Sequence, residues 1–443
     1  DAGGNHSLHD LASSDCQVCA SGQHSSSGSA VCTACGSGKY LGDDGETASA
    51  HDSEAKCVVC AVGQWSSASA AACISCEAGR YIGDAGVDAA NHDSVLDCAI
   101  CGAGQHSGLG SAACVDCAAG RFLEDNAVDV SKHDHISDCL VCKYGQHSAA
   151  GATTCINCVA GKYLTDDGVM ESAHNAEDDC TICASGQYSS AGASTCILCP
   201  KGSYLTDAAT SASHHTALSK CLVCQSGQWS GSGATVCTEC IAGTFITDDA
   251  SDVHRHDDIS DCRVCRPGQW SNVGSATCTA CIAGKFLSEM SNREDVTEVI
   301  FLQHGIDAAK HNSIDKCVVC PAGKFALVGS ATCEACPAGK FIDDDGVDAS
   351  NHISASSCTV CAKGKWSLES TRICSECEAG KYLADDGTDA ANHDEHLDCL
   401  VCNAGQYSEG LSNHECTDCE AGRFLTDAGG NHSLHDLASS DCQ

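Results

Sequence analysis

Cysteine offers the most chemistry in this chain, because 41 of the 443 residues are cysteines. They recur as C-x2-C-x12-C-x2-C, followed by x21 and the next such group. Four cysteines at this spacing fit either disulfide closure of small loops or a tetrahedral zinc site. Zinc sites of this type usually stand in reducing compartments with basic residues nearby, whereas this chain is acidic and repeats the group ten times. The pattern therefore favours disulfides and an oxidising, secreted or cell-surface location.

Two disulfide connectivities fit the pattern. A crossed arrangement joins Cys16 to Cys32 and Cys19 to Cys35, and Cys442 is then the unpaired cysteine. Both halves of each repeat begin with C-x-x-G-x-aromatic at the second cysteine of a pair, so each half looks like one closed loop. This similarity favours a serial arrangement, in which Cys16 is the unpaired cysteine. Each such loop would stabilise the fold by about 3 kcal/mol in the chain-entropy model. The serial pairs are Cys19–Cys32, Cys35–Cys57, Cys60–Cys73, Cys76–Cys98 and so on to Cys402–Cys416 and Cys419–Cys442.

A second recurring set of side chains combines an acidic cluster with a histidine in the longer half of each repeat. Clustered carboxylates suit calcium, and histidine with aspartate suits zinc or another soft metal, although the spacing is not that of an EF-hand. The interpretation that the sequence favours is structural, with the imidazole hydrogen-bonded to a turn or packed beside the disulfide. Calcium is the alternative, and no cofactor is required. The candidate metal ligands are Asp43, Asp44, His51, Asp52, Asp166, Asp167, His174, Asp385, Asp386 and His393.

Several classes of function are disfavoured by motif and charge. The sequence has no G-x-S-x-G, Walker loop or H-E-x-x-H motif, so we expect no enzymatic activity. The formal net charge of −37 argues against nucleic acid and anionic membranes as partners. No run of 18 apolar residues exists, so we expect no membrane insertion.

The cysteines and the acidic residues with histidine lie in ten tandem repeats, which must position them. The seventh repeat carries 14 extra residues. Residues 1–17 and 427–443 are identical, which predicts an array of blocks of 426 residues. In that frame, 1–15 ends a preceding unit and 442–443 starts the next block. The repeats are 16–56, 57–97, 98–138, 139–179, 180–220, 221–261, 262–316, 317–357, 358–398 and 399–441.

The composition predicts small modules without a conventional core. Only 19 residues are aromatic, and 17 of them occupy the C-x-x-G-x-aromatic position, where we expect each ring to pack on its own disulfide. Glycine, serine and aspartate interrupt every segment, so regular secondary structure should be sparse. The expected fold is small disulfide-rich modules in tandem, forming an elongated rod or solenoid of short β-hairpins and loops.

Two further features concern partners and modification. The insertion in the seventh repeat contains Ser291-Asn292-Arg293-Glu294, a capping-box pattern, and the apolar residues after it predict a short amphipathic helix. This helix would either dock a neighbouring strand through 288–304 or fold back on its own modules. Asn5 and Asn431 stand in N-x-S sequons, which predicts glycosylation in a secreted protein.

Residues 180–204 show a family resemblance through Cys180, Cys183, Gly186, Tyr188, Ser189, Gly192, Cys196, Cys199, Gly202 and Tyr204. This run resembles the ephrin-receptor-like and tumour-necrosis-factor-receptor-like cysteine-rich repeats, and the resemblance covers the whole chain. It implies extracellular, elongated modules whose loops are closed serially. It is specific for architecture rather than function, and the aspartate-rich insertion with its histidine departs from the family.

The sequence thus favours a structural role, as the repeat block of an extracellular filament, stalk or surface appendage. Copies of the chain, joined end to end and carrying glycans, would be its partners. The alternative is a receptor or adhesin ectodomain that binds a protein or glycan. A metal-sequestering protein would be indicated instead by free thiols with stoichiometric metal.

Overall fold

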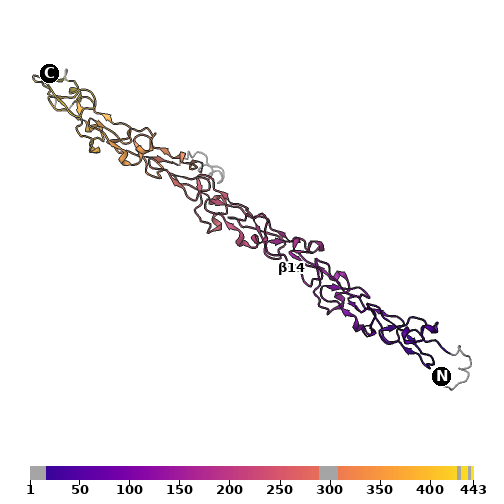
Figure 1. Ribbon diagram of the computed structural model, residues 1–443. Helices are drawn as coiled ribbons and strands as arrows, with labels where there is room; N and C mark the ends of the chain where they lie inside the picture. The colour runs from indigo at the N-terminus through magenta and orange to yellow at the C-terminus, as the bar shows by residue number, and fades with distance from the viewer. Residues whose placement is uncertain (1–15, 289–307, 427–430, 438–440) are drawn as a thin grey trace, which may run out of the picture. The chain divides into compact units, whose positions relative to one another are not determined.

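A computed structural model describes residues 16–288, 308–426, 431–437 and 441–443 (Figure 1). The chain divides into two compact units, Asp1–Cys199 with Thr206–Cys221, and Pro200–Leu205 with Leu222–Gln443. Within each unit, short two-stranded hairpins follow one another in chain order, with 3-10 turns between them and almost no helix (Figure 1). The prediction of tandem disulfide-bonded hairpin modules is confirmed.

Twenty disulfides link the described cysteines in the serial arrangement, and the crossed arrangement is absent among these residues. They alternate between a short loop, such as Cys19–Cys32 with a separation of 13, and a long loop, such as Cys35–Cys57 with a separation of 22. The insertion of the seventh repeat lengthens one long loop, Cys281–Cys317, to 36. Cys16 is exposed and has no disulfide.

Each short loop contains one antiparallel hairpin whose first strand carries the aromatic-slot residue. The glycine three residues after the opening cysteine, such as Gly22 after Cys19, adopts positive φ, and this conformation lets the chain turn into the first strand. The strand pairs are β1 (Gln23–His24) with β2 (Thr33–Ala34), β5 (Gln64–Trp65) with β6 (Ile74–Ser75), β9 (Gln105–His106) with β10 (Val115–Asp116), β13 (Gln146–His147) with β14 (Ile156–Asn157), β17 (Gln187–Tyr188) with β18 (Ile197–Leu198), β21 (Gln228–Trp229) with β22 (Thr238–Glu239), β25 (Gln269–Trp270) with β26 (Thr279–Ala280), β29 (Lys324–Phe325) with β30 (Glu334–Ala335), β33 (Lys365–Trp366) with β34 (Ser375–Glu376), and β37 (Gln406–Tyr407) with β38 (Thr417–Asp418).

Nine of the ten long loops are spanned by a second hairpin among the described residues, and its return strand begins just after the closing cysteine. The strand pairs are β3 (Lys39–Tyr40) with β4 (Val58–Val59), β7 (Arg80–Tyr81) with β8 (Ala99–Ile100), β11 (Arg121–Phe122) with β12 (Leu140–Val141), β15 (Lys162–Tyr163) with β16 (Thr181–Ile182), β19 (Ser203–Tyr204) with β20 (Leu222–Val223), β23 (Thr244–Phe245) with β24 (Arg263–Val264), β27 (Lys285–Phe286) with β28 (Val318–Val319), β31 (Lys340–Phe341) with β32 (Thr359–Val360), and β35 (Lys381–Tyr382) with β36 (Leu400–Val401).

Between these strands the long loop usually makes two 3-10 turns, and the first of them leads into the recurrent histidine. Aspartates such as Asp88 cap the first turn by accepting from a backbone N–H. The turns are η2 (Ala48–Ala50), η3 (Glu54–Lys56), η4 (Ala89–Asn91), η5 (Val95–Asp97), η6 (Val130–Lys132), η7 (Ile136–Asp138), η8 (Glu171–Ala173), η9 (Glu177–Asp179), η10 (Ala212–His214), η11 (Leu218–Lys220), η12 (Val253–Arg255), η13 (Ile259–Asp261), η14 (Ile314–Lys316), η15 (Ala349–His352), η16 (Ala355–Ser357), η17 (Ala390–Asn392), η18 (His396–Asp398) and η19 (His432–Leu434).

The core is divided into small clusters, each built on one long-loop disulfide. In eight clusters, the aliphatic residue that follows the long-loop aromatic packs against the two cysteines, as Leu41 packs against Cys35 and Cys57. Burial of one aliphatic side chain contributes about 2 kcal/mol, so cross-links must provide the rest of the stability.

The short-loop tryptophans contact the long-loop clusters of their repeats. Trp65 is partly buried and packs on the Cys76–Cys98 cluster. The ring thus reaches across to the long loop of its own repeat and helps to join the two loops. The prediction that each ring also packs on the disulfide of its own loop stays a prediction.

Consecutive repeats are joined by the same set of hydrogen bonds each time. At the junction of the third and fourth repeats, the Gly120 N–H donates to the Ser148 carbonyl at 2.9 Å, and the Gly151 N–H donates to the Cys117 carbonyl at 2.8 Å. The first of these bonds recurs at nine junctions, at 2.8–3.0 Å. The donors at these junctions are Gly38, Gly79, Gly120, Gly161, Gly202, Gly243, Gly284, Gly339 and Gly380.

The close approach of successive repeats depends on glycine, which gives a first prediction. Gly104 has φ +78°, and a Cβ there would lie 2.2 Å from the Gly151 carbonyl oxygen. Gly104→Ala should cost about 2 kcal/mol or more, since a left-handed residue with a Cβ is strained even without the clash. We expect the Cys117 amide, which donates to the Gly104 carbonyl, to exchange with solvent about 30-fold faster.

Gly108, in the same repeat, is the matched control. Its φ is not positive, and a Cβ there would meet no atom within 4 Å. Gly108→Ala should leave the exchange of the Cys117 amide within about a factor of two of the wild type. Equal effects of the two substitutions would show that the glycine contact between repeats does not stabilise them.

Candidate functional site

The recurrent histidines form the most uniform polar feature of the described chain. All ten are buried, although they are ionisable and lie near the ends of surface loops. In each, Nδ1 lies 2.6–2.8 Å from the carbonyl oxygen of a short-loop strand, as His92 does at 2.7 Å from Gln64. Each imidazole therefore ties the long loop to the short loop of its own repeat. The ten are His51, His92, His133, His174, His215, His256, His311, His352, His393 and His435.

In eight repeats the other ring nitrogen contacts an aspartate eight residues earlier. Nε2 lies 2.8–3.1 Å from a carboxylate oxygen in each of these pairs. The carboxylate is also held by its own loop, since Asp84 accepts from the backbone N–H groups of Gly86 and Val87. The pairs are Asp43–His51, Asp84–His92, Asp125–His133, Asp166–His174, Asp207–His215, Asp248–His256, Asp344–His352 and Asp385–His393.

The two partners of each imidazole decide its proton count. A carbonyl oxygen and an ionised carboxylate are both acceptors, so both ring nitrogens must donate. A neutral imidazole has one N–H and satisfies only one of these contacts. With both ring nitrogens protonated, as the raised pKa of His51 favours, the Asp43–His51 contact is a buried imidazolium–carboxylate pair.

The pKa shifts of the paired residues agree with this arrangement. The hydrogen bond from His92 lowers the pKa of Asp84 to about 2, and the bond from His174 lowers the pKa of Asp166 to about 2. The pKa of His51 is raised, first by its bond to the Gln23 carbonyl and then, against the effect of burial, by Asp43. Both shifts favour the charged form of each partner.

The structure separates the predicted metal-ligand set into two groups. Asp43, Asp166 and Asp385 lie against their histidines, whose two ring nitrogens are both hydrogen-bonded within the protein. The calcium site suggested for these residues stays a prediction. The remaining candidates, Asp44, Asp52, Asp167 and Asp386, are exposed at the surface of their loops.

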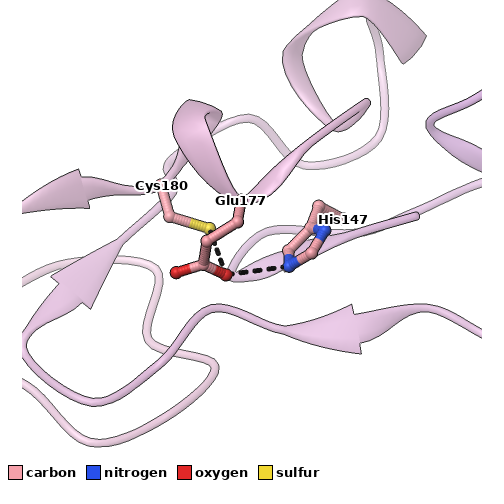
Figure 2. Close-up of side chains that lie close together, drawn as sticks. All are labelled: His147, Glu177 and Cys180. Carbon is pink, nitrogen blue, oxygen red and sulfur yellow. Dashed lines mark hydrogen bonds and ion pairs between the residues drawn. The ribbon is translucent and has the colours of Figure 1, made fainter. Parts of the chain in front are cut away.

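A cluster in the fourth repeat also brings a histidine, a carboxylate and a sulfur together (Figure 2). His147 Nε2 lies 2.9 Å from a Glu177 carboxylate oxygen, and the Cys180 Sγ lies 3.9 Å from the same oxygen. Cys180 is bonded to Cys158, so this sulfur is neither a thiol donor nor a thiolate ligand. Burial acts to raise the pKa of Glu177, but Lys162 and His147 together hold it below its ordinary value. The cluster is an ion-pair network that ties the two loops of the fourth repeat.

Sequence reasoning missed a buried serine at the repeat junctions. The serine after the short-loop aromatic donates through Oγ to a carbonyl of the preceding repeat, as Ser148 does to Arg121 at 2.9 Å. The signal was present in the sequence as a recurrent Gln-aromatic-Ser, but serine is too common in this chain to stand out. The eight serines are Ser66, Ser107, Ser148, Ser189, Ser230, Ser271, Ser367 and Ser408.

The eighth repeat offers a natural counterpart, which gives a second prediction. Ala326 occupies the serine position, fully buried, and its carbonyl still accepts from Gly284 at 2.8 Å. Ser148→Ala should destabilise its junction by about 1 kcal/mol through loss of one buried hydrogen bond, and Ala326→Ser should stabilise its own by a similar amount. Amide exchange at Gly120 and Gly284 measures the two effects, and changes of the same sign would contradict the assignment.

The predicted glycosylation sites and the predicted helix differ in whether the structure describes them. Asn431 is exposed, and its Oδ1 accepts from the Ser433 hydroxyl at 2.8 Å, so the sequon lies on the surface. Asn5 lies outside the described residues. The predicted helix also lies outside them, because the structure does not describe residues 289–307, which include all but the first residue of the proposed docking segment 288–304.

Comparison with known proteins gives this chain no family. A scan against models of protein families finds no match, and a search of the curated proteins finds none either. The chain is therefore defined by its own architecture, as tandem cysteine-rich repeats with serial disulfides and repeated β-hairpins. Its twenty disulfides indicate an oxidising environment. Among the described residues, no helix has the length and apolar character needed to cross a membrane.

Proposed function

We propose that this chain is a structural repeat block of an extracellular filament, stalk or surface appendage. The observation that carries the proposal is the uniform junction, in which the same glycine-to-carbonyl hydrogen bond joins nine pairs of consecutive repeats at 2.8–3.0 Å. A ligand-binding module needs a binding site that differs from the rest of its surface. A protein that serves as an extended support instead needs the same junction between every pair of consecutive repeats. The rod expected from the sequence, and the likeness to extracellular cysteine-rich repeats, belong to this proposal.

The last repeat supports continuation of one block into the next. Cys442 closes a disulfide with Cys419, and Gln443 exchanges two backbone hydrogen bonds with Phe424 at 2.8 and 2.9 Å. Cys16 and Gln17 repeat these two residues in an identical sequence. We therefore infer that Cys16 closes the same loop with a preceding block, so that the partners of this chain are copies of its own sequence.

The proposal requires no cofactor and gives the chain no catalytic role. Calcium would act as a counter-ion at the exposed carboxylates, since in eight loops one aspartate is already hydrogen-bonded to its histidine. Glycans would be attached at the exposed Asn431. Lateral contacts through 288–304 remain part of the proposal.

Small-angle scattering combined with sedimentation tests the proposal on the intact, oxidised chain. A compact protein of this length would have a radius of gyration of about 22 Å. We expect a value at least twice as large, together with concentration-dependent self-association. A compact particle that stays monomeric at all concentrations would contradict the filament role and favour the binding-ectodomain alternative.

A further inference from the structure

The two disulfides of each repeat differ in how far their cysteines are buried. In the second repeat, Cys60 of the short loop is fully buried, whereas its partner Cys73 is partly exposed. Both cysteines of the long loop, Cys76 and Cys98, are buried. Solvent therefore reaches one cysteine of the short-loop disulfide and neither cysteine of the long-loop disulfide.

The same difference recurs along the described chain. All ten opening cysteines of the short loops are buried, and none of the ten closing cysteines is. In eight repeats both long-loop cysteines are buried, and the exceptions are Cys221 in the fifth repeat and Cys419 in the tenth, which are partly exposed. The closing cysteines of the short loops are Cys32, Cys73, Cys114, Cys155, Cys196, Cys237, Cys278, Cys333, Cys374 and Cys416.

The core of the repeats is built on the long-loop disulfides alone. Each of the eight clusters of buried residues contains two long-loop cysteines, as Cys76 and Cys98 pack with Ile82, and none contains a short-loop cysteine. A reductant can reach a long-loop sulfur only after its cluster has come apart. It can reach the closing cysteine of a short loop while the cluster stays in place.

Hydrogen bonds hold the short loop at several points besides its disulfide. In the second repeat, the Ser66 N–H donates to the His92 carbonyl at 2.9 Å, which ties the first strand to the long loop. The Ser69 N–H donates to the Cys35 carbonyl of the preceding repeat at 3.0 Å. Neither contact involves a short-loop cysteine, so we expect both to persist when the short-loop disulfide opens.

We propose that the short-loop disulfides form a redox-sensitive set, which a dithiol reductant opens while the eight long-loop disulfides with two buried cysteines stay closed. Opening lets the chain extend, because the 13 residue steps between Cys60 and Cys73 can span about 44 Å in place of 5.8 Å. The chain can thus lengthen one short loop at a time without losing its clusters, whereas complete reduction also removes the clusters. This inference does not depend on the filament proposal, because it concerns the disulfides of a single chain.

The exchange reaction follows from which sulfur is accessible. One thiolate of the dithiol attacks the Cys73 Sγ, the S–S bond breaks, and its electron pair leaves with the Cys60 sulfur, which takes up a proton. The second thiol of the reductant then attacks the mixed disulfide, loses its proton and releases Cys73 as a thiolate, which is protonated in turn. The loop gains two electrons and two protons, and the dithiol becomes a disulfide.

Limited reduction followed by trapping tests the order of opening. The intact, oxidised chain, with Cys16 first blocked by N-ethylmaleimide, is treated with dithiothreitol for increasing times, alkylated with iodoacetamide and mapped by mass spectrometry. We expect the short-loop cysteines to be alkylated at least about tenfold faster than those of the eight buried long-loop pairs. Equal rates, or faster alkylation of the long-loop pairs, would overturn the proposal.

The same measurement in guanidinium chloride is the control for local sequence. Because unfolding removes the difference in burial, the two sets of disulfides should then open at similar rates. If the preference for the short loops were unchanged in the denatured chain, it would come from the residues beside the cysteines rather than from the fold, and the proposal would be wrong.

Two matched variants test burial as the cause. Ile82→Ala removes the side chain that packs on Cys76 and Cys98, and it should speed the opening of this long-loop disulfide at least about fivefold. Val87→Ala changes an exposed side chain in the same loop and should leave the rate unchanged. Equal rates in the two variants would contradict protection by the cluster.

The fifth repeat provides a test without substitution. Because Cys221 is partly exposed, the Cys199–Cys221 disulfide should open with the short-loop set although it closes a long loop. If it opened with the eight buried pairs instead, exposure would not decide the order, and the proposal would be overturned.

Single-molecule stretching measures the mechanical consequence in the partly reduced chain. Each opened short loop should add about 38 Å to the extended length, whereas an opened long loop of 22 residue steps would add about 69 Å. Steps of the shorter length should therefore dominate after brief reduction. A majority of the longer steps would refute the proposed order.

Discussion

Reduction of the disulfides is expected to unfold the whole chain rather than to loosen it. Each cluster of the core contains one buried aliphatic residue beside two cysteines, as in Cys76, Ile82 and Cys98. Loops of 13 and 22 residues contribute about 3 kcal/mol each by restricting the unfolded chain. Twenty such contributions exceed many times the net stability of an ordinary domain, about 5–15 kcal/mol, so no reduced form should remain folded.

Tryptophan fluorescence and single-molecule stretching measure this effect. Trp65, Trp229, Trp270 and Trp366 pack on long-loop disulfides, so reduction should shift their emission to that of exposed indole. Stretching should show an oxidised repeat of about 32 Å, from two loop spans of 5.7 Å and six residue steps of about 3.4 Å. A reduced repeat of 41 residues should extend to about 140 Å, more than four times as far.

Loss of a single bridge provides the control for this interpretation. Cys101→Ser with Cys114→Ser removes one short-loop disulfide, of separation 13. Because repeats contact their neighbours in the same way throughout, we expect increased amide exchange confined to the third repeat and its neighbours. Retention of native exchange in the fully reduced chain would refute the dominant role of the cross-links.

The cysteine frame could be predicted from the sequence because covalent spacing leaves few alternatives. Two closed loops per repeat and two short hairpins follow from where cysteine and glycine stand. The packing inside the loops could not be predicted, because Leu41 and Trp65 are both apolar and nothing local decides which lies beside the disulfide. The structure places Leu41 against the two cysteines of its long loop, and it places Trp65, from a short loop, against the long-loop cluster of Cys76, Ile82 and Cys98.

The aspartate–histidine pair shows a similar limit. The sequence revealed that acidic residues and a histidine recur in the long loop, but it grouped Asp43, Asp44 and Asp52 together. Only Asp43 faces His51, because its carboxylate also accepts from the Gly45 N–H two residues later and so closes the turn. That turn directs the next carboxylate, Asp44, to solvent. The distinction depends on turn geometry rather than on composition.

The stability of the oxidised chain is expected to be greatest between about pH 4 and 6.5. On the acid side, the folded-state pKa values of Asp84, Asp166 and Asp385 are lowered to about 2 from 3.8, mainly by their histidines. Their contribution is present above pH 3.8 and is lost as the pH falls toward 2. On the alkaline side, the pKa of His51 is raised from 6.5, so its contribution is complete below 6.5 and is lost as the pH rises through the folded value.

The alkaline loss comes from the Asp43–His51 pair, because departure of its proton leaves an Nε2 lone pair facing a carboxylate oxygen at 2.9 Å. Calorimetry from pH 2 to 10 should therefore show a broad maximum in unfolding temperature with a decline on both sides.

One substitution isolates the contribution of a single pair. In Asp84→Asn the amide can still pair with His92 but cannot ionise, so the second repeat should lose the acid-side dependence on pH that the lowered pKa of Asp84 gives it. Asp93→Asn, an exposed aspartate in the same loop, is the control and should leave the pH dependence unchanged. The protection of the Ser66 amide, which donates to the His92 carbonyl at 2.9 Å, reports on this repeat alone. If both variants retain the wild-type pH profile of this protection, the ionised Asp84 carboxylate does not stabilise the repeat.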